Sequence, residues 1–157
     1  MRKLLFSVLA FLLVLGACTS PQSSQLKIDY TQLVNPFIGT DFTGNTYPGA
    51  QAPFGMVQLS PDNGLGGWDR ISGYFYPDST IAGFSHTHLS GTGAGDLYDV
   101  LFMPVTLPYK EAKGELGIHS KFSHQDEEAS AGYYRVKLQD YNINVELTAT
   151  PRCGVQR

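Results

Sequence analysis

The sequence predicts an all-β fold, an antiparallel β-sandwich, on three observations. Between Val34 and Pro77 glycine and proline recur often, and each costs a helix interior about 1 and 3 kcal/mol respectively. Between Tyr133 and Ala149 apolar and polar residues alternate, which is the period of half-buried strands. No stretch shows a helical period over three turns. Short strands joined by structured loops are therefore expected.

The alternating region predicts two antiparallel strands. They span Tyr133–Gln139 and Ile143–Ala149, and the turn Asp140–Asn142 joins them. Leu97–Leu107 reads as a third, more buried strand, in which Pro104 indicates an edge position or a bulge. Together these segments supply part of the predicted sandwich.

The segment before this hairpin is predicted to be a charged loop. It spans Gln125–Ala131, and Ser123 is placed to cap a short helical turn at its start.

The amino terminus has the features of an export signal. Arg2 and Lys3 precede an apolar run of twelve residues, Leu4–Leu15, which is shorter than the roughly 20 residues that cross a bilayer but suits a secretory signal. The following "LGAC" resembles a bacterial lipoprotein lipobox, which implies cleavage before Cys18 and acylation of that cysteine. The alternative is an ordinary signal peptide with an incidental cysteine. A lipid anchor at Cys18 would place the protein in the bacterial cell envelope, at the periplasm or the outer membrane.

The chain after the signal suits one domain. We expect a signal peptide at 1–17, a polar tether at 18–27 and a single domain at 28–157. Loss of two basic residues with the signal changes the formal charge from −3 to −5, and the scattered basic residues exclude a nucleic-acid partner. Cys153 is then the one remaining cysteine besides Cys18, so no internal disulfide is expected. The chain stops within an apparent strand, and we expect it to be a fragment of a longer protein.

The stretch "GFSHTHLSGTGAGD" contains the densest group of candidate functional residues. His86 and His88 are two residues apart and would share one face of a strand. They are interpreted as a metal-binding pair, as polar residues lining a pocket, or as structural hydrogen-bond partners. Gly91, Gly93 and Gly95 match neither the dinucleotide fingerprint nor a P-loop, so a nucleotide site is not expected.

Four aspartates and one tryptophan indicate a second possible function, the cleavage or binding of a carbohydrate. Asp62, Asp69, Asp96 and Asp99 could include a carboxylate pair for glycoside cleavage, although aspartate beside glycine is also ordinary turn chemistry. Trp68, the single tryptophan, follows two glycines and could stack on a sugar ring or lie in the core.

Six blocks of the sequence closely resemble the N-terminal region of glycoside hydrolase family 92. They occur in the family's order and cover almost all of the predicted domain. The blocks are "VNPFIGT" (34–40), "TYPGAQAPFGMVQLSPD" (46–62), "GWD" with "SGY" (67–74), "GFSHTHLSGTGAGD" (83–96), "FSHQDEEASAGYY" (122–134) and "VELTATPRCG" (145–154).

The resemblance implies a calcium-dependent, inverting exo-α-mannosidase, with many members preferring α-1,2 linkages in mannose-containing glycans. In this family an N-terminal β-sandwich packs on an (α/α) barrel, and the barrel supplies the catalytic carboxylates and most calcium contacts. The resemblance therefore implies no catalytic residue and no metal ligand in this chain. It assigns sugar contacts, or packing on the barrel, to Trp68, Asp69, His86 and His88. A free-standing carbohydrate-binding lipoprotein is the alternative.

Overall fold

The computed structural model describes residues 28–64, 67–91, 95, 97–106 and 117–157. Cys18, Asp96 and the predicted tether lie outside these residues. None of the helical segments in the described ranges has the length and apolarity that a membrane crossing requires.

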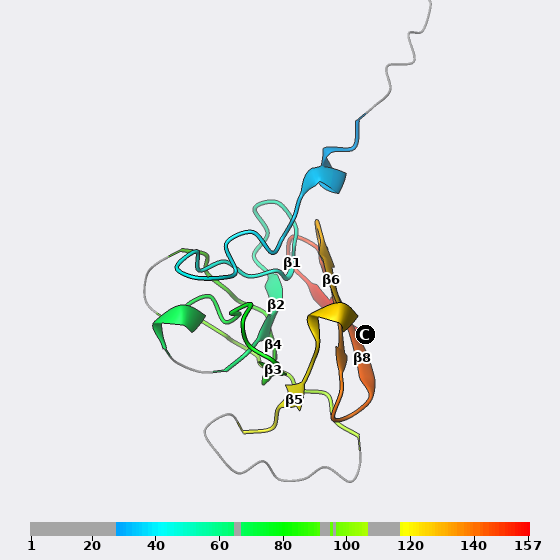
Figure 1. Ribbon diagram of the computed structural model, residues 1–157. Coiled ribbons are helices and arrows are strands. Elements are labelled where there is room, and N and C mark those ends of the chain that lie inside the picture. Colours follow the sequence, from blue (N-terminus) through cyan, green and yellow to red (C-terminus); the bar gives the residue numbers. More distant parts are fainter. Residues whose placement is uncertain (1–27, 65–66, 92–94, 96, 107–116) are drawn as a thin grey trace, which may run out of the picture.

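The regular elements in the described part of the chain are short strands and 3-10 turns, joined by loops (Figure 1). The strands are β1 (Ala50–Gln51), β2 (Gln58–Asp62), β3 (Thr80–Ile81), β4 (Gly83–Ser85), β5 (Ser120–Lys121), β6 (Glu127–Ser130), β7 (Tyr133–Leu138), β8 (Ile143–Ala149) and β9 (Gly154–Gln156). The turns are η2 (Tyr30–Leu33), η3 (Trp68–Arg70) and η4 (His124–Asp126).

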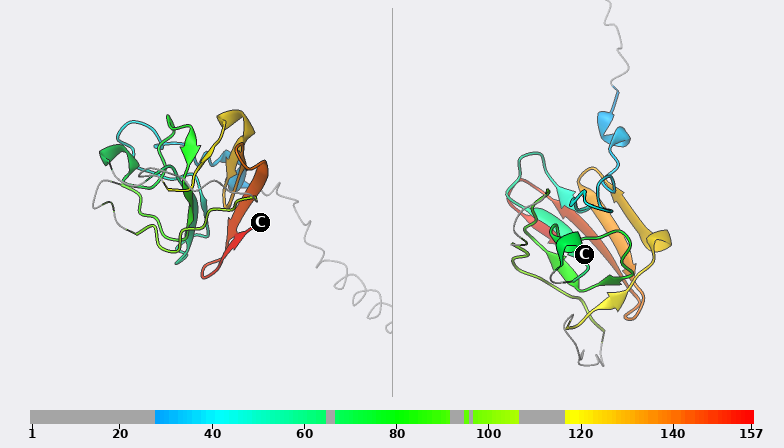
Figure 2. Two further views of the ribbon diagram at one scale, coloured as in Figure 1. Left: turned by 90° about the horizontal axis from the view of Figure 1, so that it is seen from below. Right: turned by 60° about the vertical axis from the view of Figure 1, so that its left-hand side comes forward.

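Antiparallel sheets make up the framework, as the sequence predicts. One sheet has the strand order β6-β7-β8-β9, a second has the order β1-β2-β4, and β3 pairs with β5. The first two sheets pack face to face (Figures 1 and 2), and β8 contacts both β1 and β2. The fold is therefore an all-β sandwich.

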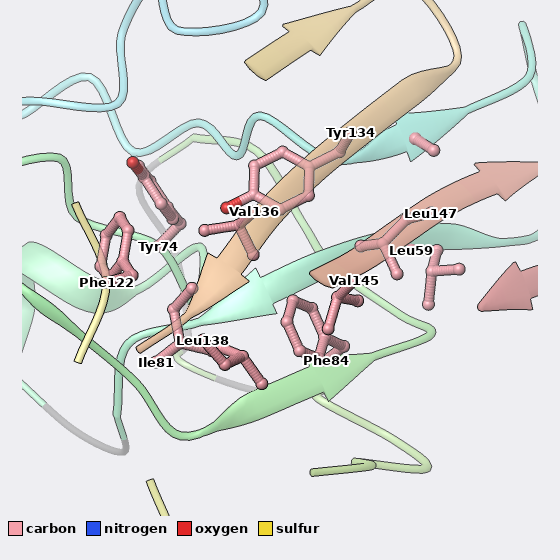
Figure 3. Close-up of a cluster of buried hydrophobic side chains, with 11 residues drawn as sticks. Leu59, Tyr74, Ile81, Phe84, Phe122, Tyr134, Val136, Leu138, Val145 and Leu147 are labelled. Atoms are coloured by element: carbon pink, nitrogen blue, oxygen red, sulfur yellow. The ribbon is translucent and has the colours of Figure 1, made fainter. Parts of the chain in front are cut away.

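Apolar side chains from the two sheets fill the space between them. Leu59 of β2 and Phe84 of β4 lie across from Val145 and Leu147 of β8 (Figure 3), and all four are buried. The alternation that predicts the hairpin also places Tyr134, Val136 and Leu138 of β7 in this core. The β7–β8 pairing, with Val136 opposite Val145, confirms the predicted hairpin.

The prediction of a buried strand at Leu97–Leu107 is wrong for its described residues, 97–106. In this segment Phe102 forms an isolated bridge with Phe84, and several of its apolar side chains are exposed. The physical reason is the backbone, because Leu97, Tyr98 and Val100 have φ values of 83°, 58° and 58°, which a β-strand does not accommodate.

The prediction for 125–131 is half right. Ser123 caps η4 as expected, since its hydroxyl accepts a hydrogen bond from the Gln125 amide at 3.2 Å. The loop that should follow is instead the strand β6, which pairs with β7. Its polar residues are compatible with this position, because charged side chains on an edge strand prevent pairing with other chains.

A buried carboxylate joins β6 to the rest of the fold. The Glu127 side chain is 1% exposed. It accepts hydrogen bonds from the hydroxyls of Tyr134 at 2.6 Å and Tyr74 at 3.0 Å, and it contacts His124 Nδ1 at 2.6 Å. The ring of His124 stacks on Tyr76 with centroids 4.0 Å apart. Three partners thus offset the free-energy cost of burying this charge.

The two tyrosines of this cluster make the folded state less stable at alkaline pH. Burial, and then the negative charge of Glu127, raises the pKa of Tyr134 and of Tyr74 above the ordinary value of 10.0. A phenol whose pKa is higher in the folded state keeps its proton there while the unfolded chain loses it. Its stabilising contribution is complete below about pH 10 and decreases as the pH rises further.

We predict that Tyr134→Phe lowers the free energy of unfolding at pH 8 by about 1–3 kcal/mol, because a buried carboxylate loses a donor. The same substitution should reduce the further loss of stability above about pH 10. Urea unfolding of both proteins across this range measures the two effects. Tyr141→Phe, outside the Glu127 cluster, is the control. An alkaline loss as steep in Tyr134→Phe as in the unmodified protein would contradict the assignment.

Candidate functional site

Trp68 lies on a loop that projects away from the four-stranded sheet. It begins η3, on the opposite side of the molecule from β8 (Figures 1 and 2), and is 65% exposed. The structure therefore does not place this tryptophan in the core. Asp69, the next residue, is also exposed.

The loop is closed at its base by Asn63, the residue after β2. The Asn63 amide donates to the Gly73 carbonyl at 2.8 Å. Its side chain donates to the Thr80 carbonyl at 2.7 Å and accepts from the Phe75 amide at 2.6 Å. These bonds hold the two ends of the loop together, and we call its described residues, 63, 64 and 67–73, the Trp68 loop.

An ion pair restrains the far side of the Trp68 loop. The Arg70 guanidinium contacts the Asp78 carboxylate through Nε–Oδ2 and Nη2–Oδ1, both at 2.6 Å. Hydrogen bonding to Asp78 raises the pKa of Arg70. This paired geometry orients the guanidinium as well as attracting it.

His88 is buried in a polar network at the end of β2. Its Nδ1 contacts the Gln58 carbonyl oxygen at 2.7 Å and therefore carries a proton. Its Nε2 lies 3.0 Å from Asp62 Oδ1 and 3.2 Å from Ser85 Oγ. The structure thus gives His88 local structural partners and little access for a ligand.

His86 faces a different part of the molecule. It is partly buried, and its Nδ1 lies 3.2 Å from the Val100 carbonyl oxygen. With Phe102 and Gln156 it lines an open, mostly apolar cavity of about 420 Å³. The two histidines contact different residues, so the interpretation of His86 and His88 as a metal-binding pair has no support in their contacts.

No group of three or more His, Cys, Asp or Glu side chains that could hold a metal ion occurs among the described residues. Calcium prefers six to eight oxygen ligands. Asp62 has a buried oxygen, Oδ2, with no hydrogen-bond partner within the described ranges, and the other oxygen of this carboxylate, Oδ1, lies 3.0 Å from His88 Nε2. The described residues therefore do not fit a calcium site.

Asp62 and Asp99 have structural partners elsewhere in the described chain. Asp99 accepts a hydrogen bond from the Thr87 hydroxyl at 3.0 Å, and its own amide donates to the same hydroxyl at 3.0 Å. Asp62 is buried against His88. These partners lie 26 and 12 residues away in the sequence, so the contacts are tertiary contacts and not those of a local turn. Asp69 remains exposed beside Trp68.

Tyr98 is the residue of this region that the sequence does not single out. Its hydroxyl shares its proton between the Arg70 carbonyl, 3.1 Å away, and the Ile71 carbonyl, so it reaches the Trp68 loop. Interpreting Leu97–Leu107 as a buried strand hides this contact, because a strand would direct the side chain differently. The residues next to Tyr98 in the sequence, which include glycine and aspartate, do not indicate this contact.

Known proteins resemble this chain over most of its length. The model of the Glycosyl hydrolase family 92 N-terminal domain matches residues 33–157. A family GH92 α-mannosidase of Bacteroides thetaiotaomicron, solved in complex with mannoimidazole, is 48% identical over 82% of this chain, with a TM-score of 0.77. An inverting GH92 mannosidase of the same organism is 30% identical over 85% of this chain, with a TM-score of 0.63.

The chain spans only a fraction of these relatives. It covers 18% of each of the two solved mannosidases. It also covers 19% of an uncharacterized secreted glycosidase of Arthroderma benhamiae, to which it is 30% identical over 151 residues. The family match over 33–157, with the sandwich fold that the solved relatives share, shows that the chain belongs to glycosyl hydrolase family 92 and contains its N-terminal domain.

Proposed function

We propose that this chain is the substrate-pocket and scaffold domain of an exo-α-mannosidase that acts on mannose-containing glycans. The observation that carries the proposal is the exposed Trp68 ring on a loop fixed at its base. An exposed aromatic ring offers an apolar surface for the face of a pyranose. The likeness to two solved mannosidases supports mannose as that sugar.

We assign the catalytic acid, the catalytic base and most calcium contacts to the region of the relatives that this chain does not cover. The relatives are more than five times as long as the matched region. We propose that an (α/α) barrel there supplies the acid and base of an inverting hydrolysis. Calcium would be bound mainly in that part too, since the donor set of the described residues does not fit it. A preference for α-1,2 linkages belongs to the same proposal.

The four candidate residues have unequal roles in this proposal. Trp68 stacks on the sugar, and Asp69 beside it accepts hydrogen bonds from sugar hydroxyls. His86 lines a cavity at the surface and contacts the sugar or the barrel. His88 is buried, so its contribution is to hold the end of β2 from which the Trp68 loop starts.

The amino-terminal signal adds a proposed location. Acylation at Cys18 would anchor the domain to the bacterial cell envelope. The likeness to a secreted glycosidase supports export.

Because the catalytic acid and base are assigned to the region that this chain does not cover, we predict that the chain alone does not hydrolyse mannobiose. Fused to the C-terminal remainder of the Bacteroides α-mannosidase that is 48% identical to it, it should give calcium-dependent activity. Released mannose measures both results. Turnover by the chain alone would contradict the assignment of catalysis to the missing part. Mannobioside binding by the chain alone, with an inactive fusion, would favour the carbohydrate-binding lipoprotein.

The role of Trp68 predicts that Trp68→Ala raises KM for a mannobioside in the fusion enzyme. Losing the buried face of one ring removes about 1–2 kcal/mol, which corresponds to roughly 5–30-fold. Trp68→Phe should retain part of the affinity. Phe54→Ala is the matched control, because Phe54 is also an exposed aromatic residue. An equal effect of both alanine variants would remove the specific role of Trp68.

The lipid anchor predicts that the expressed protein incorporates radiolabelled palmitate and partitions into the detergent phase of Triton X-114. Cys18→Ser should abolish both, because the acylated sulfur is lost. Cys153→Ser is the control, as Cys153 is an exposed free cysteine of the described chain. Labelling that persists in Cys18→Ser would exclude the anchor.

A further inference from the structure

We propose that Tyr98 is a positioning residue for Trp68. Its hydroxyl ties the Trp68 loop to the chain segment beside His86, and this contact fixes where the tryptophan ring can meet a sugar. The sugar part of this inference rests on the proposed function. The restraint on Trp68 does not.

The contact lies one turn after Trp68. The Tyr98 hydroxyl lies within hydrogen-bond distance of the carbonyl oxygens of Arg70 and Ile71, the last residue of the 3-10 turn η3 and its C-cap, and its one proton is shared between them. Arg70 O also accepts the Gly73 amide at 2.9 Å. The phenol therefore hydrogen-bonds to the backbone at the carboxyl end of η3.

The two residues that follow η3 are held by the rest of the fold, because Ile71 and Ser72 are buried and the Ser72 hydroxyl donates to the Thr46 carbonyl at 3.0 Å. The backbone of η3 itself has less restraint. Gly67 and Gly73 flank η3 with φ values of 87° and 85°, conformations that glycine adopts freely. Gly67 provides no side-chain cap, and η3 has no buried residue. The ion pair of Arg70 holds a side chain on the outer face, whereas Tyr98 holds the backbone itself.

Tyr98 is held firmly enough to act as a support. Its amide donates to the Thr87 carbonyl at 3.1 Å, and the Asp99 carbonyl accepts the His86 amide at 3.0 Å. The Thr87 hydroxyl and Asp99 exchange two further hydrogen bonds at 3.0 Å. These contacts stabilise a segment in which Tyr98 has a φ of 58°, and residues in this region persist where the surroundings fix them.

A consequence is that the two candidate motifs form one unit. The chain of contacts runs from the Trp68 loop through Tyr98 to Thr87, which lies between His86 and His88. The Tyr98 ring also packs edge-on against His88, with centroids 6.0 Å apart. Tyr98 therefore sets the relation between the tryptophan and the histidine segment.

The test uses the fact that Trp68 is the single tryptophan of the chain. Its fluorescence anisotropy decay in the folded 157-residue chain reports the motion of this loop alone. We expect restricted nanosecond motion in the unmodified chain and a clearly larger amplitude in Tyr98→Phe. Tyr141→Phe, which removes a hydroxyl outside this contact, should leave the decay unchanged. Unfolding curves for each variant separate local loosening from global destabilisation.

A second variant covers the case in which Tyr98→Phe does not fold. Thr87→Val removes the side-chain contact to Asp99 and should loosen Trp68 through the Tyr98 segment. Free rotation of Trp68 in the folded unmodified chain would overturn the proposal. So would an unchanged decay in Tyr98→Phe, or in Thr87→Val where that variant alone folds.

Kinetics in the fusion enzyme test the sugar part. Tyr98→Phe should raise KM for a mannobioside by roughly fivefold, the effect of one hydrogen bond, with kcat little changed. An unchanged KM beside a loosened Trp68 would overturn the link to sugar binding while leaving the restraint in place. An inactive unmodified fusion would instead count against the proposed function, and the anisotropy result would still decide the role of Tyr98.

Discussion

The contact between His88 and Asp62 at the end of β2 is the interaction on which the candidate site depends. His88 bridges the Gln58 carbonyl and the Asp62 carboxylate, so it fixes both ends of β2. Its Nε2 lies 3.0 Å from Asp62 Oδ1, and both side chains are buried. Gly73 packs directly on this pair, where an added Cβ would lie 2.4 Å from Asp62 Oδ1. The last residue of the Trp68 loop, Gly73, therefore packs on the His88–Asp62 pair, and a side chain at this position would not fit.

The sandwich and the site use opposite sides of the same strand pair. Leu59 and Phe84 face β8 and bury apolar area, the dominant favourable term in folding. Asp62 and Ser85 of the same strands meet His88 instead. A rigid apolar core thus supports polar groups whose burial is expensive unless they are paired. The core gives the loops a fixed base without taking part in their chemistry.

The sequence was sufficient for the parts of this arrangement that depend on local patterns. Alternation identifies β7 and β8 because a strand with one buried face repeats every two residues. It does not identify β6, whose polar residues suit an edge, and it misreads the segment after Leu97, whose positive φ values follow from tertiary contacts. The residues around Trp68 can be recognised in the sequence. The sequence does not show that the Trp68 side chain is exposed, or that Asn63 closes its loop through hydrogen bonds to residues 10 to 17 positions later. Tyr98 is invisible for the same reason, since its partners are backbone carbonyls 27 and 28 residues earlier.

Strain in the segment after Leu97 has a physical use in such a site. Each non-glycine residue in the left-handed region costs on the order of 1–3 kcal/mol, and Leu97, Tyr98 and Val100 all lie there. The bridge between Phe84 and Phe102 and the contacts of Thr87 hold this geometry in the folded state. Packing against the core thereby fixes the segment that contains Tyr98 before any ligand binds. A ring that is already held loses less freedom when it binds, which leaves more of the contact energy for affinity.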